Sequence, residues 1–187
     1  VNGPKVFSNS NNLAVSWFTV SNEKPTVNLS FSEFYGSSFG NPIKINDHDA
    51  IGRVDVAFLN DQEVLVSYME GDDVGTYLRI KKVSIDGKVS EPITISKIDS
   101  GRNTGVPQLE IHNNEIFIVW TVFENEKNQL KTVKLSSKDI LESAINTTKN
   151  GGIIHYYSHI HADKKSDAAK LSEQHYLEVV PVKSTIL

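Results

Sequence analysis

The chain has 187 residues, of which 39% are hydrophobic, 22% charged and 9% aromatic, and its formal charge is −4. This composition is typical of a globular protein and excludes a disordered or fibrous chain. Cysteine is absent, which excludes disulfides, cysteine-ligated zinc, iron–sulfur clusters and thiol nucleophiles. The modest negative charge argues against nucleic acid as a partner. No stretch approaches the roughly 18 apolar residues that span a membrane.

A repeat of about 50 residues organises residues 1–135. Three similar segments each end in a large aromatic residue, and these aromatics are 51 and 52 residues apart. The segments are Ala14–Trp17, Leu65–Tyr68 and Phe117–Trp120. Lys5, Asp55 and Gln108 lie 12, 13 and 12 residues before their aromatics, so the repeat predicts that they occupy equivalent positions.

Each repeat unit is predicted to consist of short antiparallel strands. Apolar and polar residues alternate in segments such as Thr26–Phe31, with the period of two expected for a strand. Polar clusters that predict turns between the first and second strands lie at 9–12, 60–62 and 113–115. Asp86-Gly87 predicts a type I′ hairpin turn between the third and fourth strands of the second unit.

The predicted fold is mainly β, with three four-stranded antiparallel blades of the propeller type followed by a small α+β tail. Such units are typical of propellers, because a blade buries its faces only by stacking on its neighbours. The predicted blades span residues 3–47, 52–97 and 104–135, and the tail spans 136–187. The third unit shows no fourth strand, and the chain starts without a methionine. We therefore expect a part of a larger ring, completed by further blades of the same protein. A self-contained β-sandwich of three units is the alternative.

Four segments resemble the C-terminal blades of bacterial sialidase-like propellers, which are also called BNR or Asp-box repeat propellers. These segments are Val15–Thr19, Ser32–Phe39, Gly52–Val56 and Arg102–Gln108. The resemblance covers residues 1 to about 140. It implies a partial six-bladed propeller, a secreted or periplasmic protein, and a ligand bound over the central channel.

The Asp-box motif of this family, Ser-x-Asp-x-Gly-x-Thr-Trp, is degenerate in this chain. The matching stretch, Ser32–Phe39, keeps the serine, the glycine, a hydroxyl and the final aromatic, whereas Phe34 replaces the aspartate. In that family the Asp box lies between the third and fourth strands, away from the active site, and serves folding. The departure of this stretch from the motif therefore says little about catalysis.

The candidate ligand-binding residues lie where the units begin. Arg53 and Asp55 are two residues apart and are predicted to point to the same side of a strand. Arg102 lies 49 residues after Arg53, and Gln108 shares the position of Asp55 and Lys5. The resemblance implies that Arg53 and Arg102 belong to the arginine triad that holds a substrate carboxylate, because guanidinium groups pair with carboxylates through two hydrogen bonds. A rim salt bridge between Arg53 and Asp55 is the alternative.

A complete glycosidase apparatus is not recognised in the sequence. A sialidase needs a tyrosine nucleophile with a glutamate, and an aspartate as acid and base. Tyr68 and Glu70 are interpreted as packing and strand-exit residues. We therefore expect a non-catalytic module that binds a glycan or another acidic or polyhydroxylated ligand, without a cofactor. The alternatives are an exo-acting glycosidase of the sialidase class, whose other catalytic residues lie in further blades, and a protein-interaction scaffold.

The tail, residues 136–187, resembles no recognised family. Ser137–Ile140 begins a predicted short, capped helix. His155, His159 and His161 fall within seven residues, a spacing that makes them candidate metal ligands. A partly exposed strand without metal is the favoured interpretation of this segment, because aromatic and β-branched residues surround the histidines.

Overall fold

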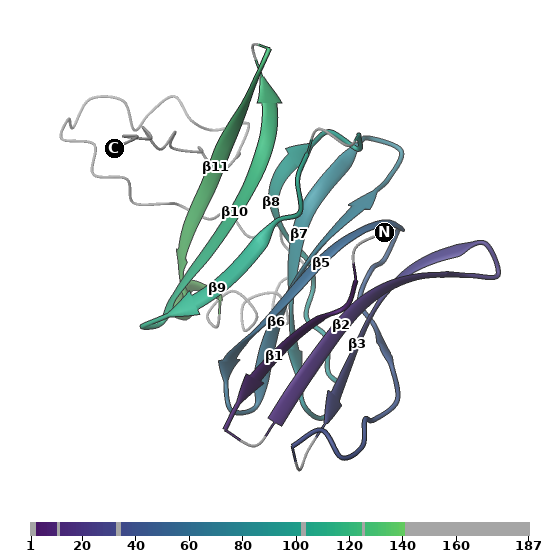
Figure 1. Ribbon diagram of the computed structural model, residues 1–187, viewed down its shortest axis with the longest axis vertical. Coiled ribbons are helices and arrows are strands. Elements are labelled where there is room, and N and C mark those ends of the chain that lie inside the picture. Colours follow the sequence, from purple (N-terminus) through teal and green to yellow (C-terminus); the bar gives the residue numbers. More distant parts are fainter. Residues whose placement is uncertain (1–2, 11, 33–34, 102–103, 125, 141–187) are drawn as a thin grey trace, which may run out of the picture.

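The computed structural model describes residues 3–10, 12–32, 35–101, 104–124 and 126–140. Within these residues the chain is mainly β, and its strands form three antiparallel sheets that do not close on one another (Figure 1). The described part also contains a helical turn at 137–140. None of the helical structure described is long and apolar enough to cross a membrane.

The sheets are meanders in which each strand pairs with the next along the chain. The first sheet consists of β1 (Lys5–Asn9), β2 (Asn12–Ser21), β3 (Lys24–Ser32) and β4 (Ile43–Lys44). The second sheet consists of β5 (Asp49–Asn60), β6 (Glu63–Gly71), β7 (Thr76–Ser84) and β8 (Ile93–Ile98). In the described residues, the third sheet consists of β9 (Gln108–His112), β10 (Glu115–Glu124) and β11 (Lys127–Ser136). The predicted antiparallel meanders are therefore confirmed, whereas their closure into a propeller is not shown.

The register of the strand pairs matches the three repeat units residue by residue. Lys5, Asp55 and Gln108 pair with Ser16, Ser67 and Val119, each of which directly precedes the aromatic residue of its unit. The three residues therefore occupy equivalent positions on the first strands, as the spacing predicted. The one extra residue in the second unit is explained by a register shift between Phe58 and Asn60 in β5.

The turns follow the predicted positions, with one correction in turn type. Asn113 and Asn114, between β9 and β10, have φ values of 51° and 62°, as a type I′ turn requires. The type I′ turn predicted at Asp86-Gly87 is wrong. Only Gly87 is left-handed there (φ 88°), and its N–H donates to the carbonyl of Ser84. The turn therefore places β-branched Ile85 at its first central position, where a left-handed φ is strongly disfavoured.

The described end of the degenerate Asp-box stretch, residues 35–39, lies between β3 and β4, the third and fourth strands of the first sheet. The Ser30 hydroxyl donates to the carbonyl of Gly40 at 2.8 Å, and the Gly40 N–H donates to the carbonyl of Phe31 at 2.9 Å. These bonds hold the end of the loop against β3.

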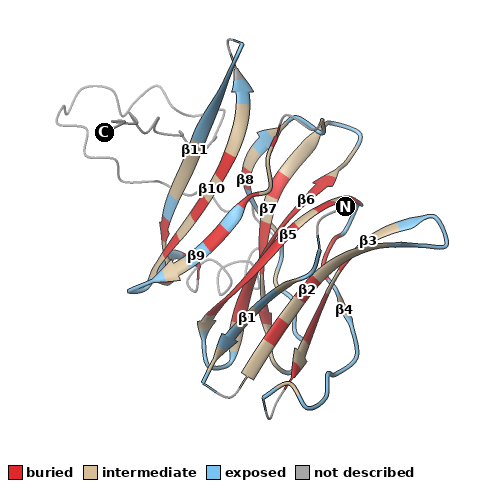
Figure 2. Ribbon diagram, in the orientation of Figure 1, coloured by how far each residue is buried: buried red, intermediate tan, exposed pale blue. Residues whose placement is uncertain are grey.

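The second sheet is covered on both faces, and its strand β6 is almost entirely buried (Figure 2). A first hydrophobic cluster joins it to the first sheet, with Ala14, Val27 and Leu29 packed against Val56, Val66 and Tyr68. A second cluster joins it to the third sheet, with Leu65, Leu78 and Ile80 packed against Ile116, Ile118 and Trp120. Phe7 packs against both clusters. Burial of apolar area at these two interfaces is the main force that holds the sheets together.

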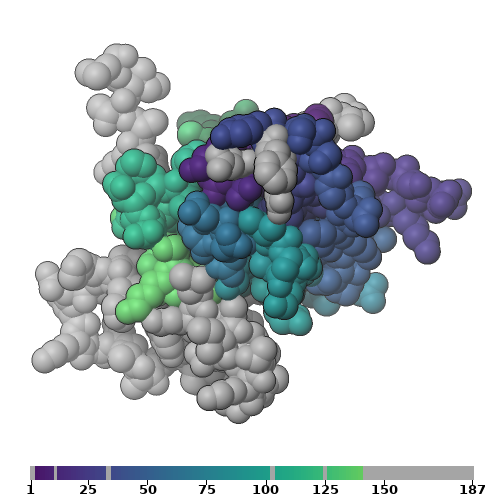
Figure 3. Space-filling view, turned by 90° about the horizontal axis from the view of Figure 1, so that it is seen from below, coloured from purple at the N-terminus to yellow at the C-terminus, as the bar shows by residue number. Residues whose placement is uncertain are grey.

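All three sheets stack in the same direction. We call the face that carries Trp17, Tyr68 or Trp120 the aromatic face of its sheet, and the other face the opposite face. Tyr68 is buried in the cluster against the first sheet, and Trp120 is buried in the cluster against the second sheet. Trp17 occupies the equivalent position but is only partly buried. Figure 3 shows the second sheet, in blue and teal, between the purple first sheet and the green third sheet.

The helical turn that follows β11 agrees with the predicted start of a helix. The Ser136 hydroxyl accepts the N–H of Lys138 at 3.2 Å and so caps the first turn. Ile140 is buried in the cluster between the second and third sheets. Residues 141–187, which include the rest of the predicted tail, lie outside the described residues.

Candidate binding site

The first strands of the three sheets bring two of their equivalent residues into contact. Lys5 Nζ donates to Gln108 Oε1 at 3.2 Å, although the two residues are 103 positions apart. Strand β5 contacts both β1 and β9 and therefore lies between them. Gln108 is exposed and Lys5 is partly exposed. The polar ends of both side chains are therefore accessible to a ligand.

Asp55, the third equivalent residue, has a structural role. Its side chain is buried, Oδ1 accepts the N–H of Val56 at 3.0 Å, and Oδ2 accepts the N–H of Leu109 at 3.0 Å. The second bond ties β5 to β9 directly. Asp55 thus fixes the spacing of the first strands, and a ligand could use its carboxylate only by displacing these backbone donors.

Arg53 lies on a bulge of β5. Gly52 and Arg53 both have left-handed φ values, 87° and 57°, and the register with β6 shifts between Gly52 and Asp55. Arg53 NH2 donates to the carbonyl of Gly101 at 2.8 Å, so Arg53 contacts the segment that leads into the third sheet, whereas Asp55 contacts β9 itself. No ion pair joins these two described side chains. The alternative of a rim salt bridge is therefore wrong.

The Arg53 guanidinium keeps hydrogen-bonding capacity for a ligand. Burial lowers its pKa from the ordinary value, and the negative charge of Asp99 partly offsets this effect. An arginine remains protonated under these conditions. Within the described residues, its hydrogen-bonding contacts are those of NH2 with Gly101 and of NH1 with Met69 Sδ at 3.9 Å. These described contacts leave other N–H donors of the five for a ligand.

Arg102, the second arginine expected to bind a carboxylate, lies outside the described residues. The described residues on either side of it are anchored to the protein. Thr104 Oγ1 donates to the carbonyl of Asp99 at 3.0 Å, and the Gly105 N–H donates to Thr121 Oγ1 at 2.7 Å.

The candidate metal ligands of the sequence analysis belong to the tail. His155, His159 and His161 lie outside the described residues. In the part of the chain that is described, no group of three or more histidine, cysteine, aspartate or glutamate side chains is placed to hold a metal ion.

A charged cluster around the buried Glu70, between the first and second sheets, was not predicted from the sequence. Its members are Asp47, Tyr68, Glu70, Asp72, Arg79 and Lys81. Glu70 is fully buried, and its Oε1 accepts a hydrogen bond from Arg79 NH1 at 2.5 Å. Its Oε2 accepts the N–H groups of Asp47 and His48, each at 2.9 Å. Glu70 thus holds the segment that connects the two sheets.

Lys81 holds the same connecting segment from the neighbouring strand. Its Nζ donates to the carbonyl of Ile45 at 2.8 Å and forms an ion pair with Asp47 at 2.7 Å. The signal for this cluster was present in the sequence, because Arg79 and Lys81 are two apart and share one face of β7. Their partners come from β6 and from the connection, so only the register of the sheet reveals the pairing.

The cluster does not have the properties of a catalytic tyrosine and glutamate pair. Tyr68 OH lies 3.5 Å from Glu70 Oε1, but both side chains are fully buried. Burial, and then the charge of Glu70, raise the pKa of Tyr68, whereas a tyrosine nucleophile must reach the substrate and lose its proton. The interpretation of both residues as packing residues agrees with their burial.

A shallow pocket of about 500 Å³ lies beside this cluster. It is lined by His48, Asp49, Ala50, Ile51, Gly71, Asp72 and Asp73. Asp72 is already engaged, since it accepts the N–H groups of Val74 and Gly75 and pairs with Arg79. The acidic lining disfavours a carboxylate ligand, so the ends of the first strands remain the better candidate site.

Comparisons with known proteins add no assignment. No protein-family model matches the chain, and no curated protein matches its sequence.

Proposed function

We propose that the chain is a non-catalytic, sialidase-like propeller module that binds an acidic or polyhydroxylated glycan where its first strands converge. The observation that carries this proposal is the contact between Lys5 and Gln108 across β5. The ammonium group attracts a carboxylate. The Gln108 amide donates from Nε2 to the carbonyls of Val106 and Pro107 at 3.3 and 3.1 Å, and because the side chain is exposed, it can exchange these bonds for bonds to sugar hydroxyls. The three meanders with adjacent first strands support the propeller assignment.

Arg53 adds a second permanent positive charge to the proposed site. In the described residues its guanidinium is held by Gly101 at NH2 and contacts Met69 Sδ at NH1, and this arrangement orients the other donors. Arg102 follows Gly101 directly in the sequence and is the third cationic residue of the proposal. Planar guanidinium groups are well suited to a carboxylate, which makes sialic and uronic acids the preferred ligand class.

Two alternatives to a glycan-binding module differ in their support. A sialidase would need an accessible tyrosine nucleophile, and the described pair Tyr68 and Glu70 is buried. The glycosidase alternative thus depends entirely on residues beyond those described. A protein-interaction scaffold is favoured by a different observation, the apolar faces exposed on the first and third sheets.

Calorimetric titration with sialic acid and with glucuronic acid tests the proposal. We expect weak binding that Lys5→Ala or Arg53→Ala each weakens by about 1.5–3 kcal/mol, or roughly 10- to 150-fold, because each removes a charged hydrogen-bond donor. Lys24→Ala is the matched control, since Lys24 is exposed on the β2–β3 hairpin that projects from the stack (Figure 1). Unchanged binding in both site variants would refute the proposed site.

The same preparation distinguishes a module from an enzyme. We expect the chain to bind a sialic acid without hydrolysing an aryl sialoside, because the described residues provide no accessible tyrosine nucleophile paired with a glutamate. Turnover by the isolated chain would contradict the non-catalytic part of the proposal.

A further inference from the structure

The first sheet exposes its aromatic face, whereas the aromatic faces of the second and third sheets are buried in the stack. Val6, on its aromatic face, is 57% exposed, whereas the equivalent residues Val56 and Leu109 are 1% and 4% exposed. The equivalence follows from the register, in which these residues pair with Val15, Val66 and Ile118. Leu13, Val15 and Trp17 lie on the same face and are only partly buried.

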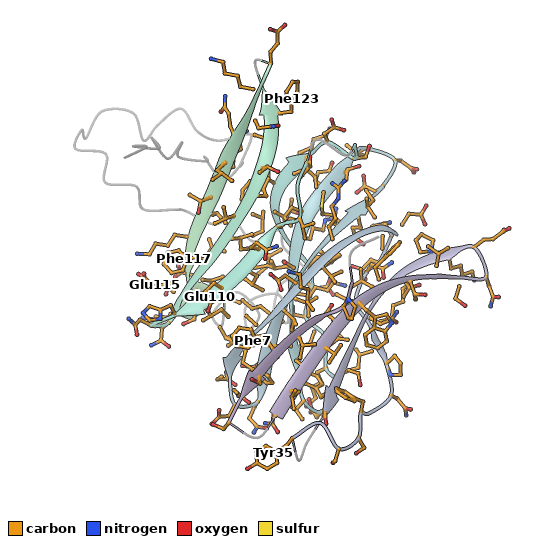
Figure 4. All side chains as sticks on the ribbon, viewed as in Figure 1. Phe7, Tyr35, Glu110, Glu115, Phe117 and Phe123 are labelled. Carbon is orange, nitrogen blue, oxygen red and sulfur yellow. The ribbon has the colours of Figure 1, made fainter. Side chains whose placement is uncertain are left out.

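The third sheet shows the same contrast on its opposite face. Leu130 is 59% exposed, whereas the equivalent residues Val27 and Leu78 are fully buried. Phe123 is also exposed, and Phe117 is partly buried. Figure 4 shows Phe117 near one end of this sheet and Phe123 at the other. Val119 lies between them on the same face of β10, and Thr121 interrupts this apolar strip.

Charged side chains border this strip. Lys134 Nζ lies 5.8 Å from the centre of the Phe117 ring and pairs with Glu115 at 2.7 Å. On the neighbouring strand β9, Glu110 is the cross-strand partner of Phe117. Polar residues also lie within this face, because Thr132 pairs with Val119 and Asn128 pairs with Phe123. Apolar side chains as exposed as Leu130 and Phe123 on one sheet face nevertheless mark a surface that a partner can cover.

The two exposed faces are the two halves of an interface that already occurs twice in the chain. The opposite face of the first sheet packs against the aromatic face of the second, and the opposite face of the second packs against the aromatic face of the third. In the described residues, the opposite face of the third sheet and the aromatic face of the first have no such partner. They are the next pair in the same series.

We propose that a second copy of this chain provides that partner, so that the opposite face of the third sheet of one copy packs against the aromatic face of the first sheet of the next. The contact is head to tail, because two different surfaces meet. Repeated contacts of this kind close into a ring or extend into a filament, depending on the rotation between successive sheets. The inference does not rest on the proposed glycan site, but it has a consequence for it. Gln108 pairs with Val119 and therefore lies on the opposite face of the third sheet, so a second copy packed there would cover Gln108 as the third sheet covers Asp55.

Analytical ultracentrifugation at protein concentrations from about 1 to 100 µM tests this contact, because it measures the mass of the assemblies in solution. We expect the unmodified chain to form assemblies larger than a monomer. Val6→Asp and Leu130→Asp should each weaken the association by at least about 100-fold, because each buries an unpaired carboxylate in the contact. Both side chains are mostly exposed within one copy, so the variants should fold. Val74→Asp, at a residue that is 73% exposed in the loop between β6 and β7, is the matched control and should assemble normally.

Mixing the two variants identifies the geometry of the contact. Val6→Asp keeps a functional third-sheet face, and Leu130→Asp keeps a functional first-sheet face. A head-to-tail contact therefore predicts that the mixture forms a dimer containing one copy of each. Three results would overturn the proposal: a monomeric unmodified chain at every concentration, assembly that survives either single variant, or a mixture that stays monomeric. In the first case, a loss of stability in Leu130→Asp would identify another segment of the same chain as the cover.

Discussion

Glu70 is the residue at which the polar contacts between the first and second sheets converge. Its carboxylate accepts hydrogen bonds from Arg79 and from two backbone N–H groups, and it is entirely shielded from water. Such a charge is tolerated in the interior because every part of it is paired. Among the described residues, removing it leaves Arg79 with Asp72 alone, at 3.2 Å, and takes the acceptor from the N–H groups of Asp47 and His48.

The first prediction follows from this burial. We expect Glu70→Ala to lower the free energy of unfolding by about 3–5 kcal/mol, because the substitution removes the closer of the two carboxylates that pair with Arg79 and the acceptor of two backbone N–H groups. Urea denaturation followed by tryptophan fluorescence measures the effect. The control is Glu91→Ala, at an exposed glutamate in the loop before β8, which should change stability by less than about 0.5 kcal/mol. Equal stabilities for the two variants would contradict the structural role of Glu70.

The second prediction concerns the ion pair of Glu63 and Lys82, which lie 2.9 Å apart on β6 and β7. Burial tends to raise the pKa of Glu63, but hydrogen bonds from Lys82 and Asn60 outweigh it and leave the pKa below the usual value. A carboxyl group with a lowered pKa in the folded state stabilises the protein fully above its unfolded pKa. This contribution is lost as the pH falls through the lowered folded pKa.

We therefore expect Glu63→Gln to be less stable than the unmodified chain at pH 7 by about 1 kcal/mol or less, since the pair is partly exposed. The difference should shrink steadily from about pH 5 downward, because the unfolded glutamate begins to bind protons there. Urea denaturation of both proteins between pH 7 and pH 3 measures the difference. A difference that stays constant over this range would rule out the ion pair as its cause.

Strand β5 is the element on which the proposed site depends. The bulge at Gly52 and Arg53 inserts residues into β5 relative to β6, and Arg53 then reaches Gly101. Gly52 is essential to this geometry for two reasons. Its φ is 87°, and a Cβ atom at this position would lie 3.1 Å from Cγ of Phe18.

The third prediction tests the bulge. Gly52→Ala should destabilise the protein by about 1–3 kcal/mol, because a side chain is strained at this φ and crowds Phe18. Gly40→Ala is the matched control, because Gly40 is not left-handed and its nearest neighbour to a new Cβ is the Phe31 carbonyl oxygen at 3.7 Å. Thermal unfolding of the two variants gives the comparison. If Gly40→Ala lost as much stability as Gly52→Ala, the loss in Gly52→Ala would not come from its left-handed φ and its contact with Phe18.

The strands could be predicted from the sequence, but several of their details could not. Period-two alternation and polar turn clusters are local signals, and they located the meanders correctly. The bulge at Arg53 and the turn type at Gly87 could not be predicted, because both depend on the φ that a residue adopts once its strand is paired. The cluster around Glu70 depends on residues that meet only across strands and between sheets. Its charged members give no sign of burial in a local window of sequence.

At the scale of the whole molecule, the direction of stacking explains why equivalent aromatic residues differ in burial. Tyr68 and Trp120 each face a preceding sheet and are buried, whereas Trp17 is only partly buried. The spacing of the repeat predicted that the three occupy equivalent strands, which the structure confirms. The sequence did not predict the exposure of Trp17, because that depends on what covers the first sheet.

The fourth prediction measures this asymmetry. Trp120→Ala should cost about 3–5 kcal/mol in the free energy of unfolding, because it opens a cavity between the second and third sheets. Trp17→Ala should cost clearly less in the monomeric Leu130→Asp background, in which no second copy covers Trp17. Urea denaturation at a single protein concentration provides both values. Equal costs for the two substitutions would contradict the directional stack.

The central claim is that equivalent residues of the first strands converge into one binding site for an acidic glycan. Titration of the ¹⁵N-labelled chain with sialic acid, followed by two-dimensional NMR, tests it most directly. We predict saturable shifts that cluster at the amides of Lys5, Gly101 and Gln108, and that are lost in Arg53→Ala but not in Lys24→Ala. An absence of saturable shifts, or shifts confined to the pocket around His48 and Asp73, would contradict the account.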